Sequence, residues 1–250
     1  MSASAPIYSA SLTKVTKRYL LDFSVRLSIF LLILFFYVSN PEILEFTAPS
    51  GLSIPLALLW VMMICSMLVQ LNPKSRLTKG CLKQYPTGYR PVRQYDTVAL
   101  KQAVQAQNRG AKKVALLWFC INFCFGILYH TGTVICSAEL ILLCAFYFLC
   151  DLICVLFFCP FQYFLMKNRC CVNCRIFAWG SWMMAAPLLL VPHWYAQSLF
   201  WTGILVLVCW EVRYHQHPER FWYGSNQALQ CSNCSEQLCR YKRIRPKHPL

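Results

Sequence analysis

The chain has 250 residues, of which 58% are hydrophobic and 13% are charged, and its net charge is +15. A mean hydropathy of +0.44 excludes a soluble globular domain of this length. The basic residues flank apolar runs, so we expect them to set the membrane orientation and to contact anionic lipid headgroups. No nucleic-acid partner is expected.

Six apolar runs predict helices that cross a bilayer core of about 30 Å. The first follows Lys14, Lys17 and Arg18 and shows no small-residue cleavage site, which predicts a retained signal-anchor. The fourth run is too long for one crossing, and Pro160 is expected to end that crossing. In chain order the predicted spans are 19–39, 52–71, 114–130, 135–166, 176–191 and 198–212.

Three further features are expected from local sequence. Asp22 and Arg26 lie four residues apart in the first span, which predicts a local ion pair. The segment 72–113 holds ten basic residues and one acid. Within it, residues 96–108 predict a short helix on the membrane surface, with a helix that docks a protein partner as the alternative. Pro187 is expected to interrupt the fifth span.

The distribution of lysine and arginine predicts the orientation. With a cytosolic N-terminus and six crossings, 23 of the 24 residues fall on the cytosolic side, and Arg26 lies inside the first span. The predicted fold is an all-α, polytopic transmembrane bundle of six spans in three hairpins, with both termini cytosolic. Its predicted parts are a cytosolic segment 1–18, a membrane domain 19–212 with the basic loop 72–113, and a cytosolic tail 213–250. The expected location is a cell membrane, the inner membrane of a bacterium.

Two C-x2-C pairs border the last predicted hairpin. Cys171 and Cys174 precede it, and Cys231 and Cys234 follow it. In the predicted orientation both pairs face the reducing cytosol, so disulfides are not expected. Four thiolates suit a structural zinc ion or an iron–sulfur cluster, and packing without metal is the alternative. The additional thiols beside the set are Cys170 and Cys239.

Asp151 is the ionisable residue predicted at membrane depth, roughly 13 Å from Pro160 by helix rise. A carboxyl group there predicts either a functional site or a packed, hydrogen-bonded acid. The i,i+4 pairs Cys120 with Cys124 and Cys150 with Cys154 have a spacing that could bind a soft metal, although packing is the commoner use.

The last third of the chain resembles an uncharacterised group of bacterial polytopic membrane proteins with cytosolic C-x2-C pairs. The resemblance rests on the runs 168–177, His217-Pro218-Glu219-Arg220-Phe221 and Cys231-Ser232-Asn233-Cys234, and it implies no activity. In that group an Asn-Trp-Asp follows the first cysteine cluster, where this chain has Ala178-Trp179-Gly180.

Two functional classes follow from these features. The first is a membrane protein with a cytosolic metal–thiolate clamp, acting as a redox or electron-transfer component or as a scaffold that docks a protein partner. The alternative is a transporter of a small solute or ion that uses Asp151, with the clamp as structure. The sequence has no nucleotide-binding loop, nucleophile triad or metalloprotease helix motif, so it does not indicate a conventional enzyme.

Overall fold

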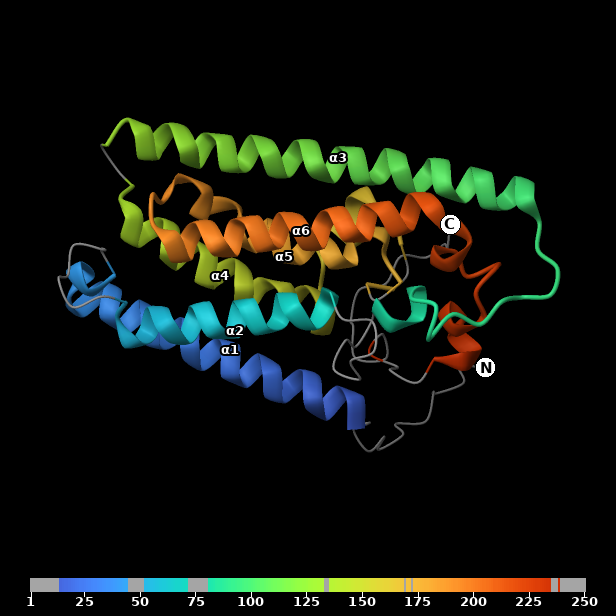
Figure 1. The fold of residues 1–250 in the computed structure, drawn as a ribbon, viewed down its shortest axis with the longest axis horizontal. Helices are drawn as coiled ribbons and strands as arrows, with labels where there is room; N and C mark the ends of the chain where they lie inside the picture. Colours follow the sequence, from blue (N-terminus) through green and yellow to red (C-terminus); the bar gives the residue numbers. More distant parts are fainter. Residues whose placement is uncertain are drawn as a thin grey trace, which may run out of the picture.

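The computed structural model describes residues 14–44, 52–71, 81–132, 135–168, 170–171, 173–234 and 238. Over these residues the secondary structure is helical, apart from one isolated bridge between Pro91 and Asn226. The long helices run side by side along one axis as a bundle (Figure 1). The prediction of an all-α fold is confirmed for this part of the chain.

Within the described ranges, five helices are long and apolar enough to cross a membrane, judged by length and composition alone. They correspond to the first, second, third, fourth and sixth predicted spans. In chain order they are α1 (Lys14–Ser39), α2 (Ile54–Leu71), α3 (Thr97–His130), α4 (Ser137–Leu156) and α6 (Trp194–Gln216). A short turn, η1 (Pro41–Ile43), follows α1, and η2 (Cys81–Gln84) precedes α3.

The third helix is longer than the sequence pattern predicts. It begins at Thr97, where the Asp96 carboxylate accepts the backbone N–H groups of Val98 and Ala99, and it runs unbroken to His130. The prediction of a separate surface helix over 96–108 is therefore wrong. Gly110 lets α3 lie close to Leu165 and Met166, because a Cβ there would lie 2.9 Å from the sulfur of Met166.

The fourth predicted run contains two elements. The helix α4 ends at Leu156, before Pro160, and a π-helical turn, η3 (Phe161–Leu165), follows. Proline lacks an N–H and cannot continue the backbone hydrogen-bond pattern of a helix that precedes it. The chain after η3 contains Cys170, Cys171 and Cys174 and is called the first cysteine segment below.

The fifth predicted span consists of three short helical pieces. These are η4 (Arg175–Trp179), α5 (Gly180–Ala185) and η5 (Ala186–Leu190), of which the first and last are 3-10 helices. Pro187 lies in the first turn of η5. None of the three is one of the five long helices, so a regular fifth span is not found. After α6 the tail forms the turns η6 (Pro218–Phe221), η7 (Gln227–Leu229) and η8 (Cys231–Asn233).

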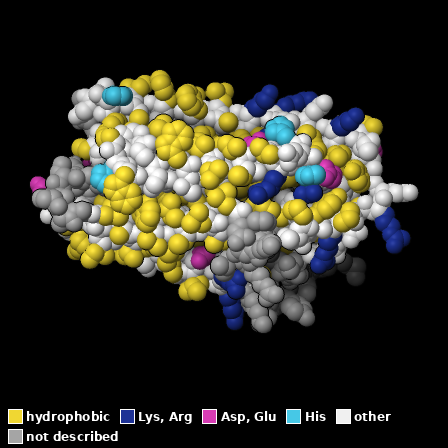
Figure 2. Space-filling view, viewed as in Figure 1, with side chains coloured by type: hydrophobic (Ala, Val, Ile, Leu, Met, Phe, Trp, Pro, Cys, Tyr) yellow, Lys and Arg dark blue, Asp and Glu magenta, His cyan; other side chains and the backbone are white. Residues whose placement is uncertain are grey.

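The two ends of the bundle differ in character. An apolar core drawn from α1, α2, α4, η5 and α6 packs one part of the bundle. Lysine and arginine side chains gather at the other end, where α1 begins and α6 ends, while hydrophobic side chains cover most of the remaining visible face (Figures 1 and 2). This end is called the basic end below.

Candidate functional site

A charged pair joins α1 to α4 within the apolar bundle. Nη1 of Arg26 lies 3.0 Å from Oδ2 of Asp151, and it donates at 2.8 Å to the backbone carbonyl of Phe148. The ring of Phe148 lies 4.0 Å from the guanidinium carbon. The Arg26 side chain is 11% exposed and that of Asp151 is 30% exposed. The predicted pair of Arg26 with Asp22 is wrong, since Arg26 finds a carboxylate and a carbonyl oxygen together on α4.

A second polar contact fixes the same two helices closer to their other end. The hydroxyl group of Tyr37 donates to Oε1 of Glu139 at 2.8 Å, and Oε2 of Glu139 accepts the backbone N–H of Cys136. Because Tyr37 is near the end of α1 and Glu139 is near the start of α4, the two helices are antiparallel. The Arg26–Asp151 pair is therefore held in a fixed register between two packed helices.

The chain leaves room for the Asp151 carboxylate at Gly180. A Cβ atom on Gly180 would lie 2.6 Å from Oδ1 of Asp151, a distance at which the two groups cannot both fit. The first position of α5 thus needs glycine for close approach, not for a special backbone conformation. The sequence contains this glycine, but the need for it depends on contact with Asp151, which lies on α4, about thirty residues earlier in the chain.

Asp151 separates two cavities. One, of about 400 Å³, is lined by Arg18, Asp22, Arg26 and the end of α2, and the other, of about 330 Å³, is lined by the first cysteine segment and α4. Asp151, Val155, Phe177 and Gly180 line both. The residues around both cavities include the start of α1 and the cysteine segment, which lie at the basic end. A carboxylate between two cavities can exchange its arginine partner for a proton, a cation or a polar solute.

A second charged pair lies between η4 and α6. The guanidinium group of Arg175 pairs with Glu211 and lies 4.2 Å from the centre of the Tyr214 ring. The indole N–H of Trp179 donates to Oε1 of Glu211 at 2.7 Å, and that of Trp210 donates to the backbone carbonyl of Arg175 at 2.6 Å. Arg175 is buried, and these contacts surround it with aromatic rings. The pair connects the irregular segment 175–190 to α6.

The first cysteine segment lies near the second, which contains Cys231 and Cys234. The side-chain amide of Asn173, inside the first C-x2-C pair, donates at 2.8 Å to the carbonyl of Leu229, just before the second pair. Cys170 and Cys231 line one further cavity of about 260 Å³. Cys239 lies outside the described residues.

The described thiols do not form the predicted four-ligand set. Among the residues that the structure describes, no group of three or more histidine, cysteine or acidic side chains is placed to hold a metal ion. Cys174 packs in the core, where burial raises the pKa of its thiol to about 12, whereas Cys231 is exposed. A shared site needs four thiolates at one point, and the described structure does not bring Cys171, Cys174, Cys231 and Cys234 together as such a set. The clamp stays a prediction.

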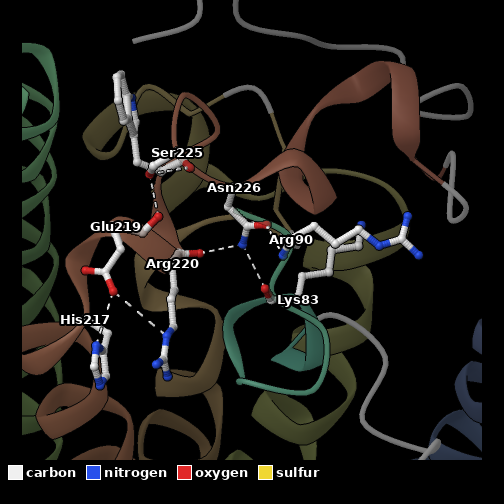
Figure 3. Close-up of polar contacts among 8 residues, drawn as sticks. Lys83, Arg90, His217, Glu219, Arg220, Ser225 and Asn226 are labelled. Carbon is white, nitrogen blue, oxygen red and sulfur yellow. Dashed lines mark hydrogen bonds and ion pairs between the residues drawn. The ribbon is translucent and has the colours of Figure 1, made fainter. Parts of the chain in front are cut away.

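A buried amide and two backbone hydrogen bonds, from Val92 to Ser225 and from Gln227 to Arg90, attach the tail to the segment before α3 (Figure 3). The side chain of Asn226 donates to the carbonyls of Lys83 and Arg220, each at 2.8 Å, and accepts the backbone N–H groups of Arg90 and Ala228. Asn226 is fully buried. The sequence does not predict this role of Asn226, because a lone asparagine in a polar tail has no pattern that distinguishes a buried side chain from a solvated one.

A small charged group lies beside this amide. Nδ1 of His217 is 3.2 Å from Oε1 of Glu219, and Nε of Arg220 is 4.0 Å from the same oxygen (Figure 3). The hydroxyl group of Ser225 donates to the carbonyl of Glu219. His217 therefore has an acidic neighbour in the described structure, which gives it a structural role in the tail.

Comparisons with protein families, with curated proteins and with solved structures found no match to this chain. The resemblance of its last third to a group of bacterial membrane proteins stays a prediction.

Proposed function

We propose that the chain is a polytopic protein of a cell membrane with six crossings, three hairpins and both termini in the cytosol. The five long apolar helices support this placement, and so does the gathering of basic residues at one end, where anionic lipid headgroups would contact them. The one crossing that is not a long helix, the fifth in chain order, would be the segment 175–190. Its two 3-10 pieces rise about 2.0 Å per residue and α5 rises about 1.5 Å, so the segment reaches about 29 Å, close to the hydrocarbon thickness.

Reporter fusions test this topology. Reporters at the N-terminus, in the segment 72–113, after Met166 and at the C-terminus are expected to report cytosol. Reporters in 40–51 and 192–197 are expected to report the opposite side. The physical reason is that translocating the basic segments would be costly, whereas the short outer connections contain no lysine or arginine. A C-terminal reporter on the outer side would contradict both the total of six crossings and the cytosolic orientation of the C-terminus.

Within this membrane placement, we infer that the protein is a carrier for a small solute or ion, with Asp151 as its intramembrane anion. The observation that carries the inference is the position of Asp151 between two cavities while it is paired to Arg26 from another helix. An ionisable pair inside a membrane is costly and commonly marks a transport pathway.

The arrangement is suited to alternating access. Both cavities include residues at the basic end, and the opposite part of the bundle is filled by the apolar core of α1, α2, α4, η5 and α6. A carrier that opens to the cytosol would use these two cavities for entry from the basic end. An incoming cation or proton would compete with Arg26 for the carboxylate, which would weaken the contact between α1 and α4 and allow the helices to move.

Neutralising Asp151 tests the carrier. Charge movement would be recorded from proteoliposomes on a solid-supported membrane after pulses of protons and of single metal ions. In Asp151→Asn the response is expected to fall at least about tenfold, equivalent to 1.4 kcal/mol, while membrane accumulation stays near the wild-type amount. The exposed Glu42 provides a matched control, and Glu42→Gln is expected to leave the response unchanged.

The same variants separate transport from structure. If the pair only holds α1 against α4, Asp151→Asn should lower the free energy of unfolding by about 2 kcal/mol, between the values for exposed and buried pairs. Pairing it with Arg26→Gln should then restore much of that stability, because neither charge is left alone. A double variant that is stable and still responds to the pulses would contradict the carrier.

The second candidate is the cysteine clamp, in which Cys171, Cys174, Cys231 and Cys234 bind zinc or an iron–sulfur cluster for a scaffold or redox role. The hydrogen bond from Asn173 to Leu229 favours it, because it brings the two cysteine segments together. Its test is metal analysis with an absorption spectrum after anaerobic purification. A clamp predicts that each of the four Cys→Ser variants loses metal and exposes the tail to protease.

A further inference from the structure

The smaller of the two cavities beside Asp151 has an aromatic lining. Six rings from α3, α4, η3, η4 and the connection after α4 line it. They belong to Trp118, Phe146, Tyr147, Phe158, Phe161 and Phe177. The centre of the Trp118 six-membered system lies 4.7 Å from the Tyr147 ring centre and 6.0 Å from that of Phe161. Rings from distant parts of the chain thus surround one space of about 330 Å³, a volume within the usual range of ligand pockets.

The charge of this cavity is negative. Among the described residues that line it, Asp151 is the one carboxylic acid, and there is no lysine, arginine or histidine. The larger cavity differs, because Arg18 and Arg26 line it together with Asp22 and Asp151. Although the chain as a whole carries a net charge of +15, the smaller cavity is therefore complementary to a cation.

One oxygen of the Asp151 carboxylate is available to such a cation. Oδ2 accepts a hydrogen bond from Arg26, whereas Oδ1 has no hydrogen-bond or ion-pair partner among the described residues. Oδ1 lies against Gly180, which lines both cavities, since a Cβ on that glycine would come within 2.6 Å of it. The Asp151 side chain is 30% exposed, so a ligand in the cavity can reach the carboxylate.

We propose that the smaller cavity binds a hydrophobic organic cation, of the class of aromatic phosphonium and quaternary ammonium ions. The faces of aromatic rings attract a cation, and their apolar bulk accommodates its substituents. Asp151 supplies the counter-charge through Oδ1. A metal ion suits this lining less, because over the described residues no group of three or more histidine, cysteine or acidic side chains is placed to hold one. The choline headgroup of a lipid also suits it less, since its phosphate would meet no basic side chain there.

The site deepens the proposed carrier function by naming a substrate class, and in that sense it rests on that function. Phe146 lines the cavity and is 44% exposed, so the lining reaches the surface of the bundle, which faces lipid in the proposed placement. At the basic end the lining includes Cys171 and Cys174 of the first cysteine segment. A cation at Oδ1 shares the carboxylate with Arg26, which weakens the contact between α1 and α4.

Binding of radiolabelled tetraphenylphosphonium to the purified full chain in detergent tests the site, with uptake by protein-free micelles subtracted. Wild-type protein is expected to bind the probe saturably. Asp151→Asn is expected to weaken binding at least about tenfold, because the counter-charge is lost, whereas the exposed Glu42 provides a control in Glu42→Gln. Phe158→Leu keeps the apolar bulk but removes a ring, and it is expected to weaken binding about threefold or more. Its matched control is Phe119→Leu on α3, because Phe119 is 65% exposed and lies outside the lining of this cavity.

A footprint on the wild-type chain keeps the test independent of how the variants fold. Cys150 lines the smaller cavity, the exposed Cys65 lines the larger one, and Cys120 is exposed on α3. Tetraphenylphosphonium is expected to slow alkylation of Cys150 and to leave the rates at Cys65 and Cys120 unchanged. Protection of Cys65 in place of Cys150 would put the cation in the larger cavity and overturn the proposal. Displacement of the probe by phosphocholine, or the lack of saturable binding, would overturn it as well.

The results also separate this site from the carrier function. If tetraphenylphosphonium binds and Asp151→Asn weakens its binding but leaves charge movement intact, the site stands and the carrier function fails. If Asp151→Asn abolishes charge movement while the wild-type chain binds no tetraphenylphosphonium, the carrier function stands and this substrate class is wrong.

Discussion

Glu211→Ala is expected to lower the free energy of unfolding by about 3 kcal/mol, because it leaves a buried arginine without its carboxylate. Arg175 cannot release its proton to escape the cost, since the guanidinium group stays charged in proteins. The Arg175 side chain is 7% exposed and that of Glu211 is 24% exposed, so the partner that remains is the more buried one. The indole N–H of Trp179 also loses its acceptor.

Unfolding by a strong detergent, followed by tryptophan fluorescence in mixed micelles, measures this effect. Glu42→Ala is the matched control, because Glu42 is exposed in the turn after α1 and its loss should change the midpoint little. Arg175→Met combined with Glu211→Met should recover most of the stability, since neither charge then remains buried alone. A Glu211→Ala protein as stable as the wild type would show that water reaches Arg175.

Replacing Asn226 by leucine is expected to release the tail from the segment before α3. The change removes two donors and an acceptor that satisfy four backbone groups, and each buried group left without a partner costs about 1–3 kcal/mol. The tail can open while the bundle stays folded, which limits the cost to the opening. We expect amide exchange at Gln227, whose N–H donates to the Arg90 carbonyl, to accelerate on the order of a hundredfold.

Hydrogen–deuterium exchange read by mass spectrometry checks this prediction, with protease cleavage after Arg220 as a second readout. Asn233→Leu is a suitable control, because Asn233 is exposed and its amide makes one hydrogen bond, to the carbonyl of Gln227. The control should change exchange in the tail several-fold at most. Equal exchange in Asn226→Leu and Asn233→Leu would mean that the bridge between Pro91 and Asn226 is maintained by other contacts.

These two expected effects and the proposed carrier concern different parts of the bundle. The Arg175–Glu211 pair and the Asn226 amide connect the irregular segment and the tail to the long helices, so their loss should appear first as lost stability. The Arg26–Asp151 pair is less buried and faces two cavities. Its loss should appear first in function, if the carrier is correct. Comparing the effects of variants at these three sites on stability and on charge movement therefore tests whether the first two are structural and the third is functional.

Local features of the sequence determined the element content. The apolar runs at 19–39, 52–71 and 198–212 each correspond to a long helix, because the length of an apolar run and its flanking polar residues are properties of neighbouring residues. The basic residues also mark one end of the bundle, as Figure 2 shows. The prediction for 96–108 is wrong because no proline separates these residues from the next span and Gly110 is accommodated within one helix. The local pattern also failed at 176–191, where Pro187 and two 3-10 pieces replace one regular helix.

The tertiary structure decided which side chains meet, since those contacts depend on how helix faces are oriented. Arg26 has an acid four residues away, yet it pairs with Asp151, 125 residues later, because packing of α1 on α4 brings the carboxylate and the Phe148 carbonyl to one point. The need for glycine at position 180 follows only from the close approach of Asp151. The role of Asn226 follows only from its hydrogen bonds to Lys83 and Arg90. The cysteine spacing predicted two nearby pairs, but the fold buried Cys174 and left Cys231 exposed, because sulfur positions follow the packing around them and not the motif.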